Sequence, residues 1–336
     1  MAAVATAPAG TSPRWIVSRS VDLSLVIGSA LAGYVYLGLY TGLHVKITLL
    51  WWFWSVGFDG THIFATASRT YFDKEARARN PKLLYGSLLV FFSLGPLMVL
   101  AGQKGLLALI VGVWAYYHVI RQHYGFLVLY KVKNRDLLPL DNKLDRLFLG
   151  VMLIFPPFHR FFIHHPEELG IKLTFARYEP VFWAIVGITA AAWMARQIGL
   201  LRMGRPRAGH FRGDVPKYLL LAAIVPLHWL TFAYMSWQAA VPTVTIVHNL
   251  QYHALVWFHN RNRYGARSVL SRSLLAYAGT ALVFSALYRI PGFQLGQVSD
   301  LAFGFFCGFG LTHYYLDSRI WRVRHDPELR QALQLA

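Results

Sequence analysis

The chain has 336 residues, of which 56% are hydrophobic and only 14% are charged, and its formal net charge is +18. A soluble globular protein carries about 25% charged residues, so this composition argues against a soluble domain and favours an integral membrane protein. The positive charge does not indicate a nucleic-acid partner, because the Lys and Arg residues gather in short loops between long apolar segments, as they do at the cytoplasmic ends of membrane helices.

Apolar segments long enough to cross a bilayer recur along the whole chain, and a membrane helix needs about 20 such residues. We predict spans at 21–43, 47–68, 83–101, 105–130, 147–163, 180–200, 217–238, 241–260, 273–290 and 300–318. The fifth is short and carries Pro156 and Pro157, so we expect a broken or re-entrant segment there. The sequence therefore predicts an all-α, polytopic transmembrane helix bundle of about ten spans over residues 21–318, with tails at 1–20 and 319–336.

The orientation of this bundle follows from its basic residues. Lys and Arg concentrate after every second span, for example in the loops 69–82, 131–146 and 201–216. Such loops lie on the cytoplasmic side, so both tails are predicted to be cytoplasmic. We expect a multi-pass protein of a bacterial inner membrane. The single cysteine, Cys307, excludes an internal disulfide and a cysteine-rich metal site.

Histidines stand out within these apolar segments. Six of the fourteen lie deep in predicted spans: His62, His118, His123, His248, His253 and His313. On each of four spans one histidine precedes the first basic loop residue by six to eight positions, which places four imidazoles in one layer about 9–12 Å inside the boundary. This layer consists of His62, His123, His253 and His313. The metal site is therefore expected near the cytoplasmic face.

Two carboxylates accompany this layer, because Asp59 lies three residues before His62 and Asp317 lies four residues after His313. Residues at these spacings share a helix face. Ionisable groups inside a bilayer are costly and mark function, and imidazoles with carboxylates favour non-haem iron. We expect one or two iron ions, with both Asp residues either ligating or accepting N–H bonds from the ligands.

Polar neighbours and paired histidines extend the site. Arg121 and Gln122 are the candidate catalytic residues, as polar partners beside the metal, with Arg121 able to pair with a carboxylate. The pairs at 118/123 and 248/253 are five residues apart, and this spacing turns about 140° beyond a full helical turn. Either one member of each pair lies outside the ligand set, or a π-bulge brings both inward. We expect the bulge.

The remaining histidines suggest other roles. On the seventh span, His228 has no partner at its depth and is expected to make a hydrogen bond between helices. Surface roles are expected for His44, His159, His164, His165, His210 and His325. His259 lies at the predicted cytoplasmic mouth, and the sequence leaves open whether it is a ligand.

Four short motifs resemble known membrane iron enzymes. They are FDGTH (58–62), HYG (123–125), HNLQYHALVW (248–257) and HYYLD (313–317). Together they are similar to elements of the Brp/Blh family, membrane oxygenases that cleave β-carotene to retinal, and more loosely to membrane fatty-acid desaturases and hydroxylases. Here the early Asp precedes its His, and no HxxHH cluster is present. The resemblance implies a membrane-embedded, histidine-ligated iron facing an apolar interior.

These observations lead to an expected function and two alternatives. We expect a membrane oxidoreductase of the oxygenase, desaturase or hydroxylase type, using O₂ on a lipid or isoprenoid, including carotenoid cleavage. With two irons, a separate reductase would supply electrons, since the chain carries no nucleotide-binding motif. One alternative is a haem-binding electron-transfer protein with facing axial histidines. The other is a proton or metal transporter with an intramembrane His/Asp relay.

Overall fold

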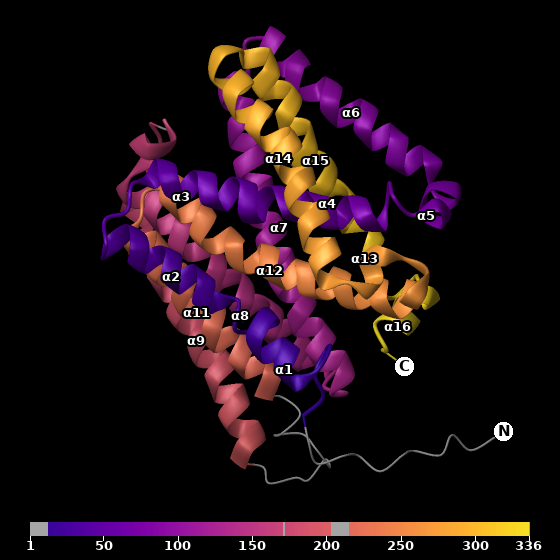
Figure 1. The fold of residues 1–336 in the computed structure, drawn as a ribbon. Coiled ribbons are helices and arrows are strands. Elements are labelled where there is room, and N and C mark those ends of the chain that lie inside the picture. The colour runs from indigo at the N-terminus through magenta and orange to yellow at the C-terminus, as the bar shows by residue number, and fades with distance from the viewer. Residues whose placement is uncertain (1–12, 171, 203–214, 336) are drawn as a thin grey trace, which may run out of the picture. The chain divides into compact units, whose positions relative to one another are not determined.

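Helices make up the structure, and no strand occurs in the residues that the computed structural model describes, which are 13–170, 172–202 and 215–335 (Figure 1). Six segments are long and apolar enough to cross a membrane: Arg19–Thr41, Pro81–Leu100, Pro139–His164, Ala176–Leu200, Val215–Tyr234 and Leu274–Val298. This confirms the prediction of an all-helical protein suited to a membrane.

The other four predicted spans are also helical, although they lie outside this group of six. One is built from α3 (Ile47–Trp54), the π-helix η2 (Ser55–Asp59) and α4 (Gly60–Arg69); the others are α7 (Lys104–Lys133), α12 (Trp237–Tyr264) and α15 (Asp300–Ile320). These helices carry the paired and layered histidines and their polar neighbours, which lower their mean hydropathy.

The chain divides into two compact units. The first contains residues 1–43 and 122–244, and the second contains residues 44–121 and 245–336. Helices α7 and α12 therefore each contribute residues to both units.

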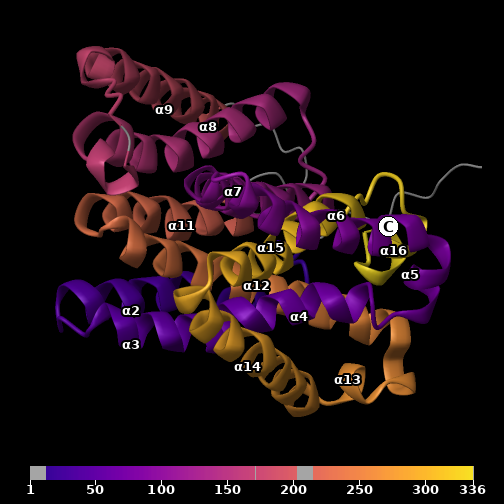
Figure 2. The ribbon, with the colours of Figure 1, turned by 90° about the horizontal axis from the view of Figure 1, so that it is seen from above.

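In the first unit, α8 packs against both α9 and α11, and α11 packs against α2 (Figure 2). Its helical elements are α1 (Arg19–Val21), η1 (Asp22–Val26), α2 (Ala30–Thr41), α8 (Pro139–Phe158), η3 (His159–His164), η4 (Pro166–Leu169), η5 (Ala176–Tyr178), α9 (Glu179–Arg202) and α11 (Val215–Tyr234). Met152, Phe155 and Val186 form the centre of an apolar core between α8 and α9.

The two prolines of the fifth predicted span do not break α8, contrary to expectation. A proline lacks the N–H that would bond to the carbonyl four residues earlier, so Pro156 frees the carbonyl of Met152. Trp229 on α11 donates its indole N–H to that oxygen at 3.0 Å. A neighbouring helix thus satisfies the freed group, which is the condition for proline at membrane depth. The helix changes to the π-helix η3 only at His159.

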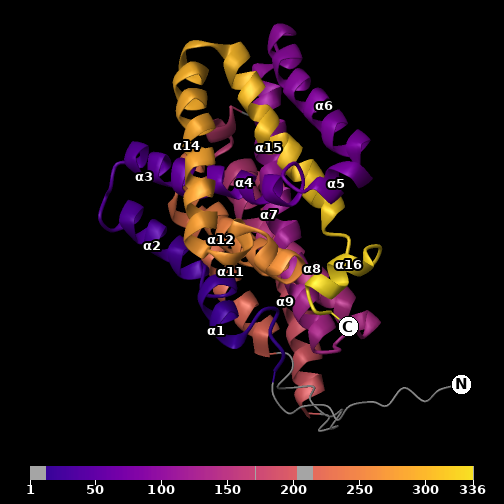
Figure 3. The same cartoon turned by 45° about the vertical axis from the view of Figure 1, so that its right-hand side comes forward.

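In the second unit, α14 and α15 form a hairpin, and α6 lies alongside α15 (Figures 1 and 3). Its remaining elements are α5 (Lys74–Arg79), α6 (Pro81–Leu100), η6 (Gly265–Arg267), α13 (Val269–Arg272), α14 (Leu274–Val298) and α16 (Pro327–Ala332). Ser273 and Ser299 cap α14 and α15 by accepting backbone N–H bonds at 3.2 and 3.3 Å, as serine does at helix starts.

Glycines set the close approach of α6 and α15. A Cβ on Gly95 would lie 1.9 Å from the carbonyl oxygen of Gly304, and a Cβ on Gly304 would lie 2.7 Å from the carbonyl carbon of Gly95. No larger residue fits at either position unless the two backbones move apart. Small residues serve the same purpose in other membrane helix pairs, where packing rather than hydrophobicity drives association.

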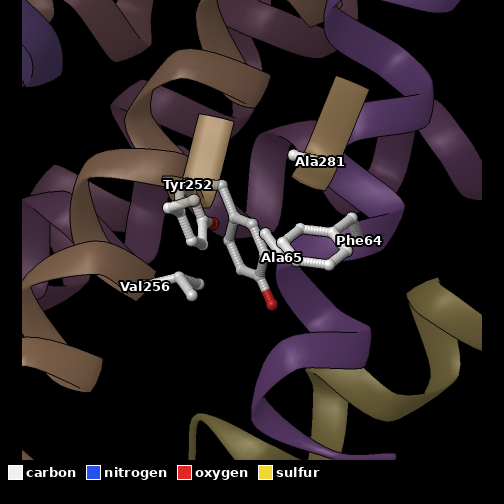
Figure 4. Close-up of a cluster of buried hydrophobic side chains, with 6 residues drawn as sticks. Phe64, Ala65, Tyr252, Val256 and Ala281 are labelled. Atoms are coloured by element: carbon white, nitrogen blue, oxygen red, sulfur yellow. The ribbon is translucent and has the colours of Figure 1, made fainter. Parts of the chain in front are cut away.

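A buried cluster joins α4, α12 and α14 (Figure 4). Phe64 and Ala65 come from α4, Tyr252 and Val256 from α12, and Ala281 from α14. Because α4 and α12 also carry His62 and His248, this cluster fixes the spacing of two candidate ligands.

The C-terminal segment forms the short helix α16. Asp326 caps it by accepting the N–H of Leu329 at 2.9 Å, and Leu329 is fully buried. Glu328 pairs with Arg79 at 2.6 Å on the exposed side. The hydrogen bond from Arg79 lowers the pKa of the Glu328 carboxyl.

Candidate metal centre

Four histidines from four helices meet inside the second unit. They are His62 on α4, His118 on α7, His248 on α12 and His313 on α15. Each offers one ring nitrogen, and these four atoms all lie within 4.8 Å of one another. Three of the residues are 2% exposed, and the His118 side chain is 11% exposed. Such a group, drawn from facing helices, is how helix bundles build metal sites.

The ring nitrogens at the centre of this group are in direct contact. The Nε2 atom of His62 lies 2.7 Å from Nε2 of His313 and 3.0 Å from Nε2 of His248. A neutral imidazole has one N–H donor and one lone pair, and a hydrogen bond weakens steeply away from linearity. A single proton on His62 therefore cannot serve both contacts well, whereas a cation between the nitrogens would satisfy all three lone pairs.

A polar network favours one tautomer of His313. Thr66 Oγ1 donates its only hydrogen to Asp317 Oδ1 at 2.9 Å and lies 2.7 Å from Nδ1 of His313. With this hydrogen directed to Asp317 and the Tyr252 hydroxyl 2.8 Å away, Thr66 is placed to accept the Nδ1–H of His313, the tautomer that leaves the lone pair on Nε2. Tyr252 also donates to Asp317 Oδ1, at 2.7 Å. Partners of this kind select the tautomer and orientation of metal-binding histidines.

The two predicted carboxylates have different positions. Asp317 lies beside the group, with Oδ2 3.6 Å from His118 Nε2 and Oδ1 3.8 Å from His313 Nδ1. It acts through Thr66 and Tyr252, which agrees with the alternative in which it orients the ligands. Asp59 ends the π-helix η2 and forms an ion pair with Arg289 of α14. The sequence predicts that Asp59 and His62 share one site because they lie on one face of a regular helix. The structure instead pairs Asp59 with Arg289.

The four histidines that converge in the structure are not the four that were predicted from their depth in the spans. Helices α7 and α12 are regular, so the predicted π-bulges are absent and each five-residue pair diverges. His253 borders the four without joining them: its ring lies 6.4 Å from that of His62, while its Nε2 lies 3.0 Å from Thr61 Oγ1 and its Nδ1 3.1 Å from the Tyr277 hydroxyl. His123 belongs to the first unit, where its ring lies 5.6 Å from that of His228.

The other predicted residues also have defined places. Arg121 is exposed, and Gln122, the next residue of α7, belongs to the first unit. His228 Nδ1 bonds to the carbonyl of Ile224 in its own helix at 2.8 Å, and its ring lies 5.6 Å from that of His123 on α7. His259 is buried, and its Nδ1 lies 3.0 Å from Asn260 Oδ1; it is not one of the converging four. His210 lies outside the described residues.

Sequence reasoning missed Thr66 and Tyr252, although a signal exists. Each converging histidine is followed four residues later by a polar side chain: His62 by Thr66, His118 by Gln122, His248 by Tyr252 and His313 by Asp317. Residues four apart lie on the same helix face, so the side chain one turn on can support its histidine. The pattern distinguishes His118 and His248 from His123 and His253, which are followed by Leu127 and Trp257.

An apolar cavity of about 220 Å³ reaches the site. Its walls come mainly from α4, α6, α14 and α15, and include Ile63, Leu88 and Phe309. Thr66 and His313 also line it. Because pockets for drug-sized ligands measure roughly 300–1,000 Å³, this cavity suits one segment of a hydrocarbon chain rather than a whole lipid.

The chain matches no protein-family model, no curated protein and no solved structure. The functional argument therefore rests on the geometry of the four histidines, the network behind them and the adjoining cavity.

Proposed function

We propose that this protein is a membrane-embedded non-haem iron oxidoreductase that uses O₂ on a lipid or isoprenoid substrate. The observation that carries the proposal is the contact of three imidazole Nε2 atoms, from His62, His248 and His313, beside an apolar cavity. Imidazole suits iron, copper, zinc and nickel, and oxygen-activating non-haem iron needs histidine ligands with open positions.

A single ion per chain fits the group better than two. All four nitrogens lie within 4.8 Å of one another, and the two carboxylates that a second ion would need are occupied elsewhere. Asp59 pairs with Arg289, and Asp317 accepts hydrogen bonds from Thr66 and Tyr252. When bound, the iron would supply the activation of O₂.

The residues around the site have separable roles in this proposal. Asp317 accepts the hydroxyl hydrogen of Thr66, so the Thr66 oxygen can accept the Nδ1–H of His313. The lone pair on His313 Nε2 then stays available to a metal ion. The apolar walls of the cavity would place an apolar chain against His313. A carotenoid or another long isoprenoid would extend beyond these walls, with only the reacting segment inside. A long substrate with only its reacting segment in the cavity is consistent with the motif resemblance to β-carotene-cleaving oxygenases.

The two alternative functions receive less support. Axial haem ligands lie on opposite faces of the porphyrin, so their nitrogens are about 4 Å apart with the macrocycle between them. Nitrogens 2.7 and 3.0 Å apart leave no such space. A proton or metal relay needs successive ionisable groups across the membrane, whereas these histidines gather at one point.

The reaction type is tested with labelled oxygen. Purified protein loaded with ferrous iron is incubated with a total bacterial lipid extract under ¹⁸O₂, with ascorbate as electron donor. We expect lipids or isoprenoids that carry ¹⁸O, or that have lost two hydrogens in a desaturation, as read by mass spectrometry. The His62→Ala protein is the control. If both proteins leave the same unchanged extract, the proposal is wrong.

We further propose that all ten helical segments cross a bacterial inner membrane with both termini in the cytoplasm. Basic loops after every second segment support this topology. In a Cys307→Ser background, Asn80→Cys and Arg135→Cys should resist an impermeant maleimide added to intact cells, while Gln103→Cys and Lys172→Cys should react. Labelling of Arg135→Cys from outside would show that one of the first four segments does not cross.

A further inference from the structure

A second cluster of metal-binding side chains lies in the first unit. His159 and His164 belong to the π-helix η3, and Glu179 is the first residue of α9. His159 Nε2 lies 2.9 Å from Glu179 Oε1 and 3.1 Å from His164 Nε2. The distance from His164 Nε2 to Glu179 Oε1 is 3.4 Å. Two imidazoles and one carboxylate thus meet within contact distance.

The π-helix is the reason that the two histidines converge. Residues five apart diverge in a regular α-helix, but a π-helix closes its hydrogen bonds between residues five apart. The N–H of His165 bonds to the carbonyl of Arg160 at 2.6 Å in this pattern. Accordingly, the rings of His159 and His164 lie 4.4 Å apart. The sequence suggests such a distortion at two other histidine pairs, and the structure has it here.

Neighbouring groups hold this cluster in place. Trp183 donates its indole N–H to Glu179 Oε1 at 3.3 Å, and the Trp183 ring lies 5.4 Å from that of His159. Phe155 packs against both rings, 5.2 Å from that of His159 and 4.8 Å from that of Trp183. Supporting contacts of this kind orient metal ligands before an ion arrives.

The cluster is open to its surroundings, unlike the buried histidines of the second unit. Its three side chains are 26, 47 and 31% exposed for His159, His164 and Glu179. An ion bound there would keep positions for water. Two histidines with one glutamate form an established zinc ligand set, whereas Ca²⁺ and Mg²⁺ prefer sites built from oxygen ligands.

We propose that His159, His164 and Glu179 form a second metal site, which binds Zn²⁺ independently of the buried histidine centre. The ion joins the π-helix η3 at the end of α8 to the first turn of α9. It thereby fixes the connection between these two helices, which includes the short helices η4 and η5.

Site-resolved chemical footprinting tests this inference. The full-length protein in detergent is treated with diethylpyrocarbonate, with and without Zn²⁺, and modification of each histidine is read by tandem mass spectrometry. We expect Zn²⁺ to lower the modification of His164 at least 5-fold and to protect His159 as well. The neighbouring His165 is the internal control, because it is equally exposed, at 47%, and its side chain forms an ion pair with Glu167 outside the cluster.

Variants complete the test. Glu179→Gln and His164→Ala should each weaken Zn²⁺ protection of His159 at least 10-fold, measured as the concentration for half protection. His165→Ala should leave that concentration unchanged. Circular dichroism of each variant confirms that helices are retained. Equal modification of His164 with and without Zn²⁺, or an equal loss of protection in His165→Ala, overturns the inference.

Discussion

Replacing His248 by Ala is expected to remove nearly all bound iron, whereas replacing His253 by Ala is expected to retain most of it. The two histidines lie on the same helix and differ by five residues. The Nε2 atom of His248 lies 3.0 Å from that of His62. By contrast, the ring of His253 lies 6.4 Å from that of His62, but both of its nitrogens already contact other groups, Thr61 and Tyr277, so it is expected to act as an outer neighbour rather than as a ligand. Losses of about 10–100-fold in affinity are typical of such outer groups.

The measurement is iron per chain in protein purified without chelators, together with the absorption spectrum. The wild-type protein should hold about one iron and show no Soret band. A second matched pair lies on α7, where His118→Ala should behave like His248→Ala and His123→Ala like His253→Ala. Full iron occupancy in His118→Ala and His248→Ala would contradict the assignment. Loss of iron only in His123→Ala and His253→Ala would favour the ligand layer that was predicted from depth in the spans.

Replacing Asp145 by Asn is expected to destabilise the first unit severely. Asp145 is fully buried and pairs with two buried lysines, Lys131 and Lys217, the latter at 3.4 Å. Asp136 shares both lysines, at 3.7 and 3.3 Å. The substitution would leave two buried cations with one anion. Breaking a buried pair in this way costs about 3–5 kcal/mol.

Thermal unfolding in detergent measures this effect. With about 2–4 °C per kcal/mol for a unit of this size, the apparent midpoint should fall by about 6–20 °C. Glu328→Gln is the control, because it removes an acid from an exposed ion pair with Arg79, and such pairs contribute little. If Asp145→Asn is as stable as Glu328→Gln, the buried pairs do not hold the unit together.

The helical architecture could be predicted because it depends on local composition. Long apolar segments, basic loops and prolines at helix starts are visible in the sequence, and each predicted span is helical over most of its length. The capped starts at Ser273 and Ser299 are of the same local kind. Features determined within one helical turn are accessible to sequence reasoning.

The site was only partly predictable because depth along a helix does not give direction around it. Counting residues to the nearest basic loop put His123 and His253 in the layer, but their helices turn them away from His118 and His248. The π-helices could not be located either: the structure has them at 22–26, 55–59 and 159–164. Likewise, the partner of Asp59 is Arg289, which is far away in the sequence.

The order of the four converging histidines along the chain has a consequence for assembly. His62 is made early, His118 and His248 follow, and His313 comes from α15, the last long helix. A chain shorter than 313 residues lacks one of the four histidines, so the complete ligand set of the proposed centre exists only once α15 has been made. In the proposed metal centre, full coordination therefore depends on the packing of α15 against the other three helices, and the loaded fraction of newly made protein would report how many chains have packed this helix.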